Sequence, residues 1–257
     1  MNINLLTFDE IDSTNTEALK QARLGADEGV CILARHQTAG RGRHGRTWVS
    51  ESDAGLYFSI ILRPKIETQF LPLITLMTGV AVHDCLAEFG INADIKWVND
   101  LHVDGKKISG ILAETTDTPK GLAVIVGIGI NITGGNARVS ERGDRAVEVG
   151  ASMWNDATSL KEQDVSVTPS TLVESLTKYV TYFYTILQSD NGPAEIIDEW
   201  RKRSSYYSGK PVRVVLENES LFGVTDGLEP NGALRLKRND GSISIIQAGD
   251  VEQLRAT

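Results

Sequence analysis

The chain has 257 residues, of which 41% are hydrophobic and 23% charged, and its formal net charge is −8. This length accommodates one large domain, or a large and a small one, each with its own core. The acidic balance argues against a surface for duplex DNA, which needs clustered basic residues. The N-terminal sequence lacks the pattern of a signal peptide, and no run reaches the ~18 apolar residues of a membrane span.

The two cysteines, Cys31 and Cys85, lie inside the apolar stretches VCILA and AVHDCLAEF. Cysteines in such surroundings are typically buried and reduced. We therefore expect a cytoplasmic protein with neither a membrane nor DNA as partner.

The body of the chain alternates strand and helix patterns. We expect a helix after Ser13 or Thr14, which would cap it, with Gly25 as its end. Further helices are predicted over residues 70–90, 168–187 and 192–204, and the helix over 168–187 has Thr168 as cap and Pro169 at its first position. Buried strands are predicted over residues 30–36, 56–62 and 122–132.

Residues 95–103 and 106–114 predict a hairpin, because Asp104-Gly105 suits a type I′ turn. Its register would pair Val103 with Lys106, His102 with Lys107 and Asp100 with Ser109. One face of the hairpin would then carry Asp100, His102, Lys107 and Ser109, with Lys96 further along. Asp100 and Lys107 would be diagonal neighbours, ~7–8 Å apart at the backbone. The alternatives are a ligand-binding face and a solvated face with an incidental ion pair.

The pattern of predicted elements changes after Ser208, where short strands alternate with ENES, EPNG and NDGS turns. This pattern predicts a small all-β barrel of about fifty residues, and hence a division into residues 1–207 and 208–257. Residues 133–167 have no strong periodicity and predict an irregular excursion. The whole indicates an α+β or α/β fold whose sheet is mostly antiparallel.

The segment HQTAGRGRHGRTW, residues 36–48, holds three arginines among three glycines. It satisfies G-x-G-x-x-G, but a strand follows it where a dinucleotide site needs a helix. It is either a merely soluble loop or an anion site, and we favour the anion site because arginine offers bidentate, permanent charge. Its glycines predict a mobile loop that an anionic ligand folds.

The run Gly127-Ile128-Gly129-Ile130-Asn131 ends the most apolar predicted strand. Its glycines admit either a neighbouring element or a ligand close to the backbone. The sequence shows no Ser/His/Asp or Cys/His set, and its four histidines lack metal-ligand spacing. A covalent enzyme nucleophile is therefore not indicated.

In order along the chain, DSTN, HQTAGRGRHGRTW, KWVNDL, GKKISGIL, VGIGINI and a terminal β domain resemble the biotin protein ligases. The resemblance covers the chain except about residues 133–155. It departs from the family's usual pattern at Val98, where proline is common. It implies the α+β fold of the class II synthetase/biotin ligase type, with a mixed, mostly antiparallel sheet packed with helices and a small C-terminal SH3-like β-barrel.

The resemblance also implies a reaction in two steps, with Mg²⁺ as cofactor. The carboxylate of biotin attacks the α-phosphate of ATP to give biotinyl-5′-AMP, and a lysine of a carrier domain then displaces AMP. The implied partner is the biotin carboxyl carrier protein domain of a biotin-dependent carboxylase. No helix-turn-helix precedes DSTN, which implies the monofunctional class without DNA binding. A homodimer is compatible with it.

The resemblance also implies functional residues, at the positions of this sequence that match the family's motifs. Lys107, Arg43 and Arg41 would be catalytic. Biotin would be bound by Ser13, Thr14, Asn15, Gln37, Gly40, Arg41, Gly42, Arg43, Lys107, Gly110, Gly127 and Gly129. ATP would be bound by Arg41, Arg43, Arg46, Trp48, Asn99, Asp100, Lys107 and Asn131, with Asp100 also holding Mg²⁺.

Two alternatives stay open at this point. One is a lipoate or octanoate ligase or transferase of the same fold, which labelling of a carrier domain with either acid would separate. The other is a non-enzymatic RNA- or phosphate-binding module, which predicts salt-dependent RNA binding through Arg41 and Arg43. That module gives no reason for Lys107→Ala to abolish adenylate formation.

Overall fold

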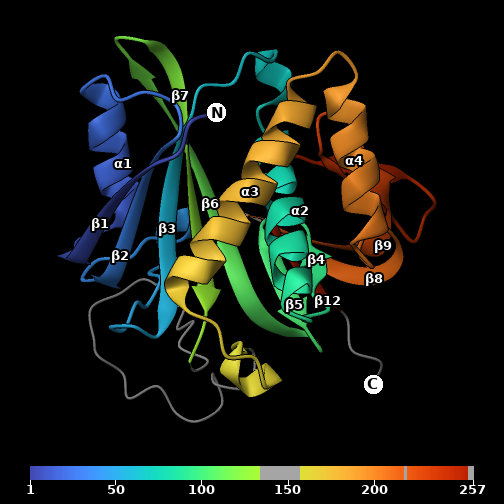
Figure 1. Cartoon of the computed structure of the whole chain (residues 1–257). Coiled ribbons are helices and arrows are strands. Elements are labelled where there is room, and N and C mark those ends of the chain that lie inside the picture. The colour runs from blue at the N-terminus through green and yellow to red at the C-terminus, as the bar shows by residue number, and fades with distance from the viewer. Residues whose placement is uncertain (134–156, 217–218, 254–257) are drawn as a thin grey trace.

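A seven-stranded sheet forms the centre of the protein (Figure 1). The computed structural model describes residues 1–133, 157–216 and 219–253. In spatial order the strands are β1 (Asn4–Ile11), β2 (Val30–Gln37), β3 (Gly55–Leu62), β7 (Gly121–Asn131), β6 (Lys106–Thr118), β5 (Asp100–Val103) and β4 (Asp94–Lys96). β1 and β2 are parallel and the other neighbours antiparallel. The predicted α+β fold with a mostly antiparallel sheet is confirmed.

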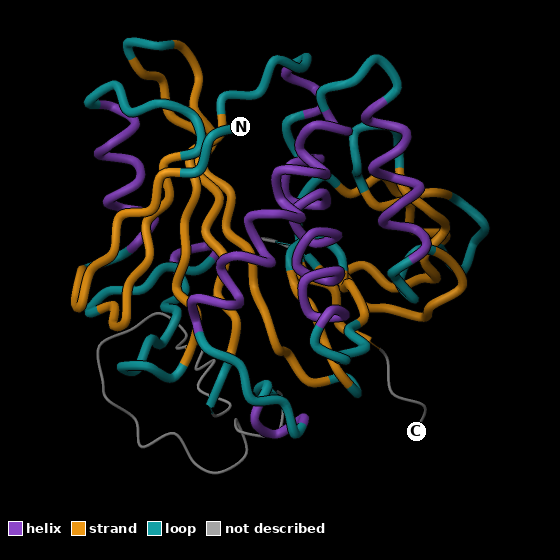
Figure 2. Tube along the Cα trace, viewed as in Figure 1, coloured by secondary structure: helices purple, strands orange, loops and turns teal. Residues whose placement is uncertain are grey.

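Helices lie on both sides of this sheet, as Figures 1 and 2 show. They are α1 (Thr14–Arg23) on one side and, on the other, α2 (Leu73–Glu88), α3 (Pro169–Leu187) and α4 (Gly192–Lys202). Short 3₁₀ turns occupy Arg43–Gly45, Thr68–Phe70 and Lys161–Gln163. Ala18 and Ala22 of α1 are fully buried, and the small alanine side chain lets this helix lie close to the strands. Most residues of α2 are apolar and buried, because the helix is enclosed by the sheet, α3 and α4.

Helix ends follow the predicted signals. Thr168 Oγ1 accepts a hydrogen bond of 3.2 Å from the backbone N–H of Thr171, and Pro169 occupies the first helical position of α3. Ser13 is the N-cap of α1, but its side chain makes no capping bond. Gly25 has φ +91° just beyond that helix, in the left-handed region that favours glycine.

The predicted hairpin is formed by β5 and β6. Asp104 and Gly105 have φ of +50° and +77°, as a type I′ turn requires. Val103 pairs with Lys106 and His102 with Lys107, as predicted. The predicted pairing of Asp100 with Ser109 is wrong, because a register shift between Leu101 and His102 puts Asp100 opposite Gly110.

The predicted strand over residues 95–103 is also wrong in part. It divides into β4 and β5, which pair with each other so that Lys96 lies opposite Asp100. Asn99 stabilises the connection, because its backbone carbonyl accepts from the N–H of Ile111 at 2.9 Å and its amide donates to the carbonyl of Ile111 at 3.0 Å. The hydrogen bonds of Asn99 thus take the place of the backbone pairing that a continuous strand would have at this point.

A second sheet, of five antiparallel strands, occupies the C-terminal part. Its order is β11 (Ile243–Ile246), β10 (Leu234–Lys237), β9 (Ser220–Leu228), β8 (Ser208–Val215) and β12 (Asp250–Gln253). Its buried Val212 and Leu236 belong to the same hydrophobic core as α2. Trp97 joins the two sheets, since its indole N–H donates to the carbonyl of Gly232 at 3.0 Å. The domain division 1–207 and 208–257, and the SH3-like barrel, stay predictions.

The predicted excursion over residues 133–167 lies mostly outside the described residues. From Ala157 onward the chain returns to the sheet, where the N–H of Thr158 donates to the carbonyl of Lys107 at 2.9 Å. Within the described ranges, no helix is long and apolar enough to cross a membrane.

Candidate active site

A pocket of about 700 Å³, including the space at its open mouth, lies over β6 and β7 beside the first turn of α1. Most of the predicted site residues line it. Those residues are Ser13, Thr14, Asn15, Gln37, Arg41, Gly42, Arg43, Arg46, Trp48, Asn99, Asp100, Lys107, Gly110, Gly127 and Gly129. The structure thus brings together motifs from four separate stretches of sequence.

One end of the pocket is lined by uncharged, hydrogen-bonded side chains. The Thr14 backbone N–H donates to Oε1 of Gln37 at 2.8 Å, and the Thr14 hydroxyl oxygen lies 3.1 Å from the same atom. The hydroxyl of Ser59 lies 2.8 Å from Oγ1 of Thr14 and 2.6 Å from Oδ1 of Asn15. These residues are buried, so the network is set in a low-dielectric environment where its geometry is fixed. It suits a neutral ring that carries its own donors and acceptors.

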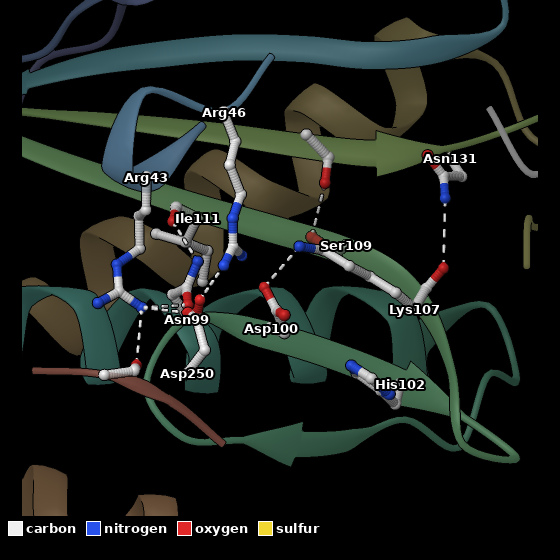
Figure 3. A network of polar contacts seen from close by, with 12 residues as sticks. Arg43, Arg46, Asn99, Asp100, His102, Lys107, Ser109, Ile111, Asn131 and Asp250 are labelled. Atoms are coloured by element: carbon white, nitrogen blue, oxygen red, sulfur yellow. Dashed lines mark hydrogen bonds and ion pairs between the residues drawn. The ribbon is translucent and has the colours of Figure 1, made fainter. Parts of the chain in front are cut away.

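The other end is charged. Nζ of Lys107 lies 2.7 Å from Oδ1 of Asp100 (Figure 3). Burial alone would raise the pKa of Asp100, but the Lys107 ammonium, a hydrogen bond from His102 and the charge of Lys96 together outweigh it and hold that pKa well below its usual range. Burial lowers the pKa of Lys96, on the neighbouring strand. Lys107 Nζ also lies 5.4 Å from the ring centre of Trp48, within the range of a cation–π contact.

The arginine loop covers this end, and protein acceptors hold each of its arginines. Arg41 Nη2 lies 2.6 Å from Oε1 of Glu114. Arg43 Nη1 donates to Oδ1 of Asn99 at 2.9 Å and to the carbonyl of Gly249 at 3.4 Å, and Arg46 pairs with Asp250 (Figure 3). The C-terminal sheet therefore contributes to the wall of the pocket through β12.

Arg43 stays charged although it lies among buried groups. Burial lowers the pKa of this guanidinium, whereas the carboxylates of Asp250 and Asp100 act in the opposite direction. An arginine starts from a pKa above about 12, so it is protonated at neutral pH. The pocket thus holds permanent positive charge.

The glycines of β6 and β7 make room for side chains of the protein itself. A Cβ at Gly127 would lie 2.2 Å from Oδ1 of Asn15, and one at Gly129 would lie 2.5 Å from the ring of Trp48. A Cβ at Gly110 would lie 3.0 Å from both Lys107 and Trp48. These glycines therefore allow close packing of side chains, and since they also line the pocket, the approach of a ligand to their backbone stays a prediction.

Two predicted residues lie outside the pocket lining. Gly40 allows the two stems of the loop to approach, because a Cβ there would lie 2.2 Å from the carbonyl of Trp48. Asn131 donates to the carbonyls of Thr158, at 2.9 Å, and Lys107, at 3.3 Å. Its predicted contact with ATP stays a prediction.

Sequence reasoning missed several residues at the site. Tyr57 and Phe58 line the pocket, but they lie in a strand that was expected to be core. Ser59 and Glu114 contact Asn15, and Asp250 lines the pocket from β12. Period-two alternation along residues 56–62 and 106–114 could have assigned Ser59 and Glu114 each to one face of its strand. No local sequence pattern relates Asp250 to the arginine loop.

Comparisons with known proteins agree with this geometry. Residues 7–131 match the model described as the Biotin/lipoate A/B protein ligase family, and residues 207–253 match the Biotin protein ligase C terminal domain. The fold and the pocket thus define a protein of the biotin and lipoate ligase class.

Individual relatives narrow this class. The chain is 33% identical to the bifunctional ligase/repressor BirA of Bacillus subtilis, over 98% of this chain and 74% of that protein. It is 32% identical to the biotin–[acetyl-CoA-carboxylase] ligase of Mycobacterium tuberculosis, over 95% and 86% of the two chains. The structure of the Aquifex aeolicus biotin protein ligase in complex with biotin and ATP is similar, with a TM-score of 0.78, 28% identity and coverage of 98% and 99%. The chain belongs to the biotin protein ligase family.

Proposed function

We propose that this protein activates biotin with ATP to biotinyl-5′-AMP and transfers the biotinyl group to a lysine of a carrier domain. The observation that carries the proposal is one pocket with an uncharged hydrogen-bonding end and an end where Lys107 meets the arginine loop. A neutral ureido ring and a carboxylate that becomes an acyl phosphate match these two ends. The curated relatives named as biotin ligases disfavour the lipoate alternative.

In the first step an oxygen of the biotin carboxylate attacks the α-phosphorus of ATP, and pyrophosphate leaves. Negative charge accumulates on the oxygens around phosphorus, and Lys107, Arg41 and Arg43, which line the pocket, would stabilise it. Arg46 would hold the departing phosphates. The chain supplies position and charge and needs no nucleophile of its own.

In the second step the ε-amine of the acceptor lysine attacks the acyl carbon of the adenylate. The C–O bond to AMP breaks, AMP leaves with the electron pair, and the amine loses a proton. The acceptor we propose is the biotin carboxyl carrier protein domain of a biotin-dependent carboxylase.

Mg²⁺ would enter with ATP. The described residues hold no group of three or more His, Cys, Asp or Glu that could bind a metal ion. Asp100 is a single carboxylate in the pocket wall, and Mg²⁺ is commonly bound by one or two carboxylates together with substrate phosphates. This donor set therefore fits a Mg²⁺ ion that arrives on the nucleotide, where it would neutralise phosphate charge.

We also propose that the protein works in the cytoplasm, independently of DNA and membranes. Cys31 and Cys85 are free and buried, as expected of thiols in a reducing compartment. The homodimer stays a prediction that light scattering would test.

The proposal is tested by incubating the protein with ATP, a purified carrier domain and either biotin or lipoate. We expect the carrier domain to be labelled with biotin when ATP is present. Labelling by lipoate alone, or no labelling with either acid, would contradict the proposal.

A further inference from the structure

Glu114, on β6, joins the two ends of the site although it is outside the pocket lining. Its Oε2 accepts a hydrogen bond of 2.9 Å from Nδ2 of Asn15, at the floor of the pocket. Its Oε1 lies 2.6 Å from Nη2 of Arg41, in the loop above. A single carboxylate thus binds a floor residue with one oxygen and a loop residue with the other.

The contact with Glu114 determines which way the amide of Asn15 points. Nδ2 of Asn15 also donates to the carbonyl of Leu112 at 3.3 Å. A carboxylate and a backbone carbonyl are acceptors only, so the NH₂ group of Asn15 must face both of them. Its two donor positions are then used within the protein, and the carbonyl oxygen of Asn15 is the atom left to contact a ligand.

Oδ1 of Asn15 has the capacity to accept a further hydrogen bond. The hydroxyl of Ser59 lies 2.6 Å from this oxygen, and it occupies one of the two lone pairs of a carbonyl oxygen. The second lone pair can accept from a ligand N–H. Glu114 therefore makes Asn15 an acceptor, which is the group that a ureido N–H needs.

We infer that Glu114 is a positioning residue of the biotin site, which fixes Asn15 as an acceptor and tethers the arginine loop through Arg41. This inference rests on the proposed function for the identity of the ligand. Glu114 acts through Asn15 and Arg41, and its loss should change biotin binding and loop exposure more than the rate of the chemical step.

Two substitutions separate these contacts. Glu114→Gln keeps a side-chain oxygen that accepts from Asn15, and so preserves the amide orientation, but it removes the charge that holds Arg41. Glu114→Ala removes both contacts. We expect Glu114→Ala to raise the KM for biotin about tenfold, with a smaller change in kcat, in biotin-dependent ATP–pyrophosphate exchange. Glu114→Gln should stay within about twofold of wild type in this KM.

The exposure of the arginine loop is measured as the rate of tryptic cleavage after Arg41, Arg43 and Arg46, in the full chain without ligands. Both variants should be cut about threefold faster than wild type, or more, because each releases Arg41. Glu88→Gln is the matched control, since Glu88 also has two partners, Ser175 at 2.7 Å and Lys178 at 3.2 Å, but joins α2 to α3. It should leave both the KM and the cleavage rate unchanged.

The inference is overturned if Glu114→Ala keeps the wild-type KM for biotin, if loop cleavage is unchanged in both variants, or if Glu88→Gln has the same effects. The cleavage measurement needs no biotin chemistry. A wild-type protein that fails to use biotin would therefore contradict the proposed function, whereas unchanged cleavage would contradict the tether.

Discussion

Nζ of Lys107 lies 2.7 Å from Oδ1 of Asp100, across the two strands of the β5–β6 hairpin. The side chains of both residues are about one-fifth exposed, at 19% and 21%. Asp100 thus holds the compact positive charge of Lys107 in place at the wall of the pocket. A substrate carboxylate or phosphate that approaches Lys107 meets a charge whose position is already fixed.

The first prediction concerns Lys107 itself. Lys107→Ala removes a charge that we propose acts on the α-phosphate, and we expect it to lower the rate of adenylate formation by about 10²–10³. Lys107→Arg keeps the charge on a larger, planar group and should lose less. Biotin-dependent pyrophosphate exchange measures both, and a Lys107→Ala variant with wild-type rate would exclude this role.

The second prediction concerns Asp100 and pH. Asp100→Asn leaves the Lys107 ammonium without its partner and should lower the free energy of unfolding at pH 7 by about 1–3 kcal/mol. The folded-state pKa of Asp100 is depressed, so its stabilisation is present above the unfolded pKa of about 4 and is lost as pH falls through the folded value. Urea unfolding should give a constant difference between variant and wild type from pH 5 to 8, which shrinks at more acidic pH. A difference that grows on acidification would refute this assignment.

A third prediction tests the contact between the arginine loop and β12. Asp250→Asn removes the charge that pairs with Arg46, so tryptic cleavage within residues 41–46 should become about threefold faster without ligands. Glu252→Gln is the control, because Glu252 lies on the same strand and pairs with Arg213 at 3.7 Å. Biotin with ATP should protect the wild-type loop, and equal cleavage with and without ligands would count against folding of the loop around them.

The fourth prediction uses the bare backbone of Gly129. Gly129→Ala places a methyl group 2.5 Å from the Trp48 ring, so Trp48 must move and the KM for ATP should rise about tenfold or more. In a Trp48→Ala background the same substitution should have little further effect, because the clashing ring is absent. Additive losses in the double variant would show that Gly129 acts by some other route.

Local chemistry made part of this structure predictable. Asp104-Gly105 can form a type I′ turn with little strain. Thr168 followed by Pro169 favours the start of a helix, because the threonine side chain can accept from a backbone N–H of the first turn and proline is tolerated at the first position. The order of the sequence motifs, through the family resemblance, also predicted most of the residues that line the pocket. These features depend on neighbours in sequence or on short motifs.

Other features depend on contacts between distant residues, which no local pattern reveals. Arg46 and Asp250 are 204 positions apart, and they come together only in the folded protein, where both line the pocket. The break between β4 and β5 depends on the hydrogen bond from Asn99 to Ile111. The alternation of residues 95–103 does not reveal this bond and predicts one continuous strand. Glu114 resembles any exposed strand residue until Asn15 and Arg41 are placed beside it.

In the proposed function, this pocket joins biotin to AMP. Biotin-dependent exchange of radiolabelled pyrophosphate into ATP measures that step directly, without a carrier domain. We predict exchange by the wild-type protein that requires biotin and is lost in Lys107→Ala. Exchange supported by lipoate and not by biotin, or no exchange with biotin by the folded protein, would show that this pocket does not activate biotin.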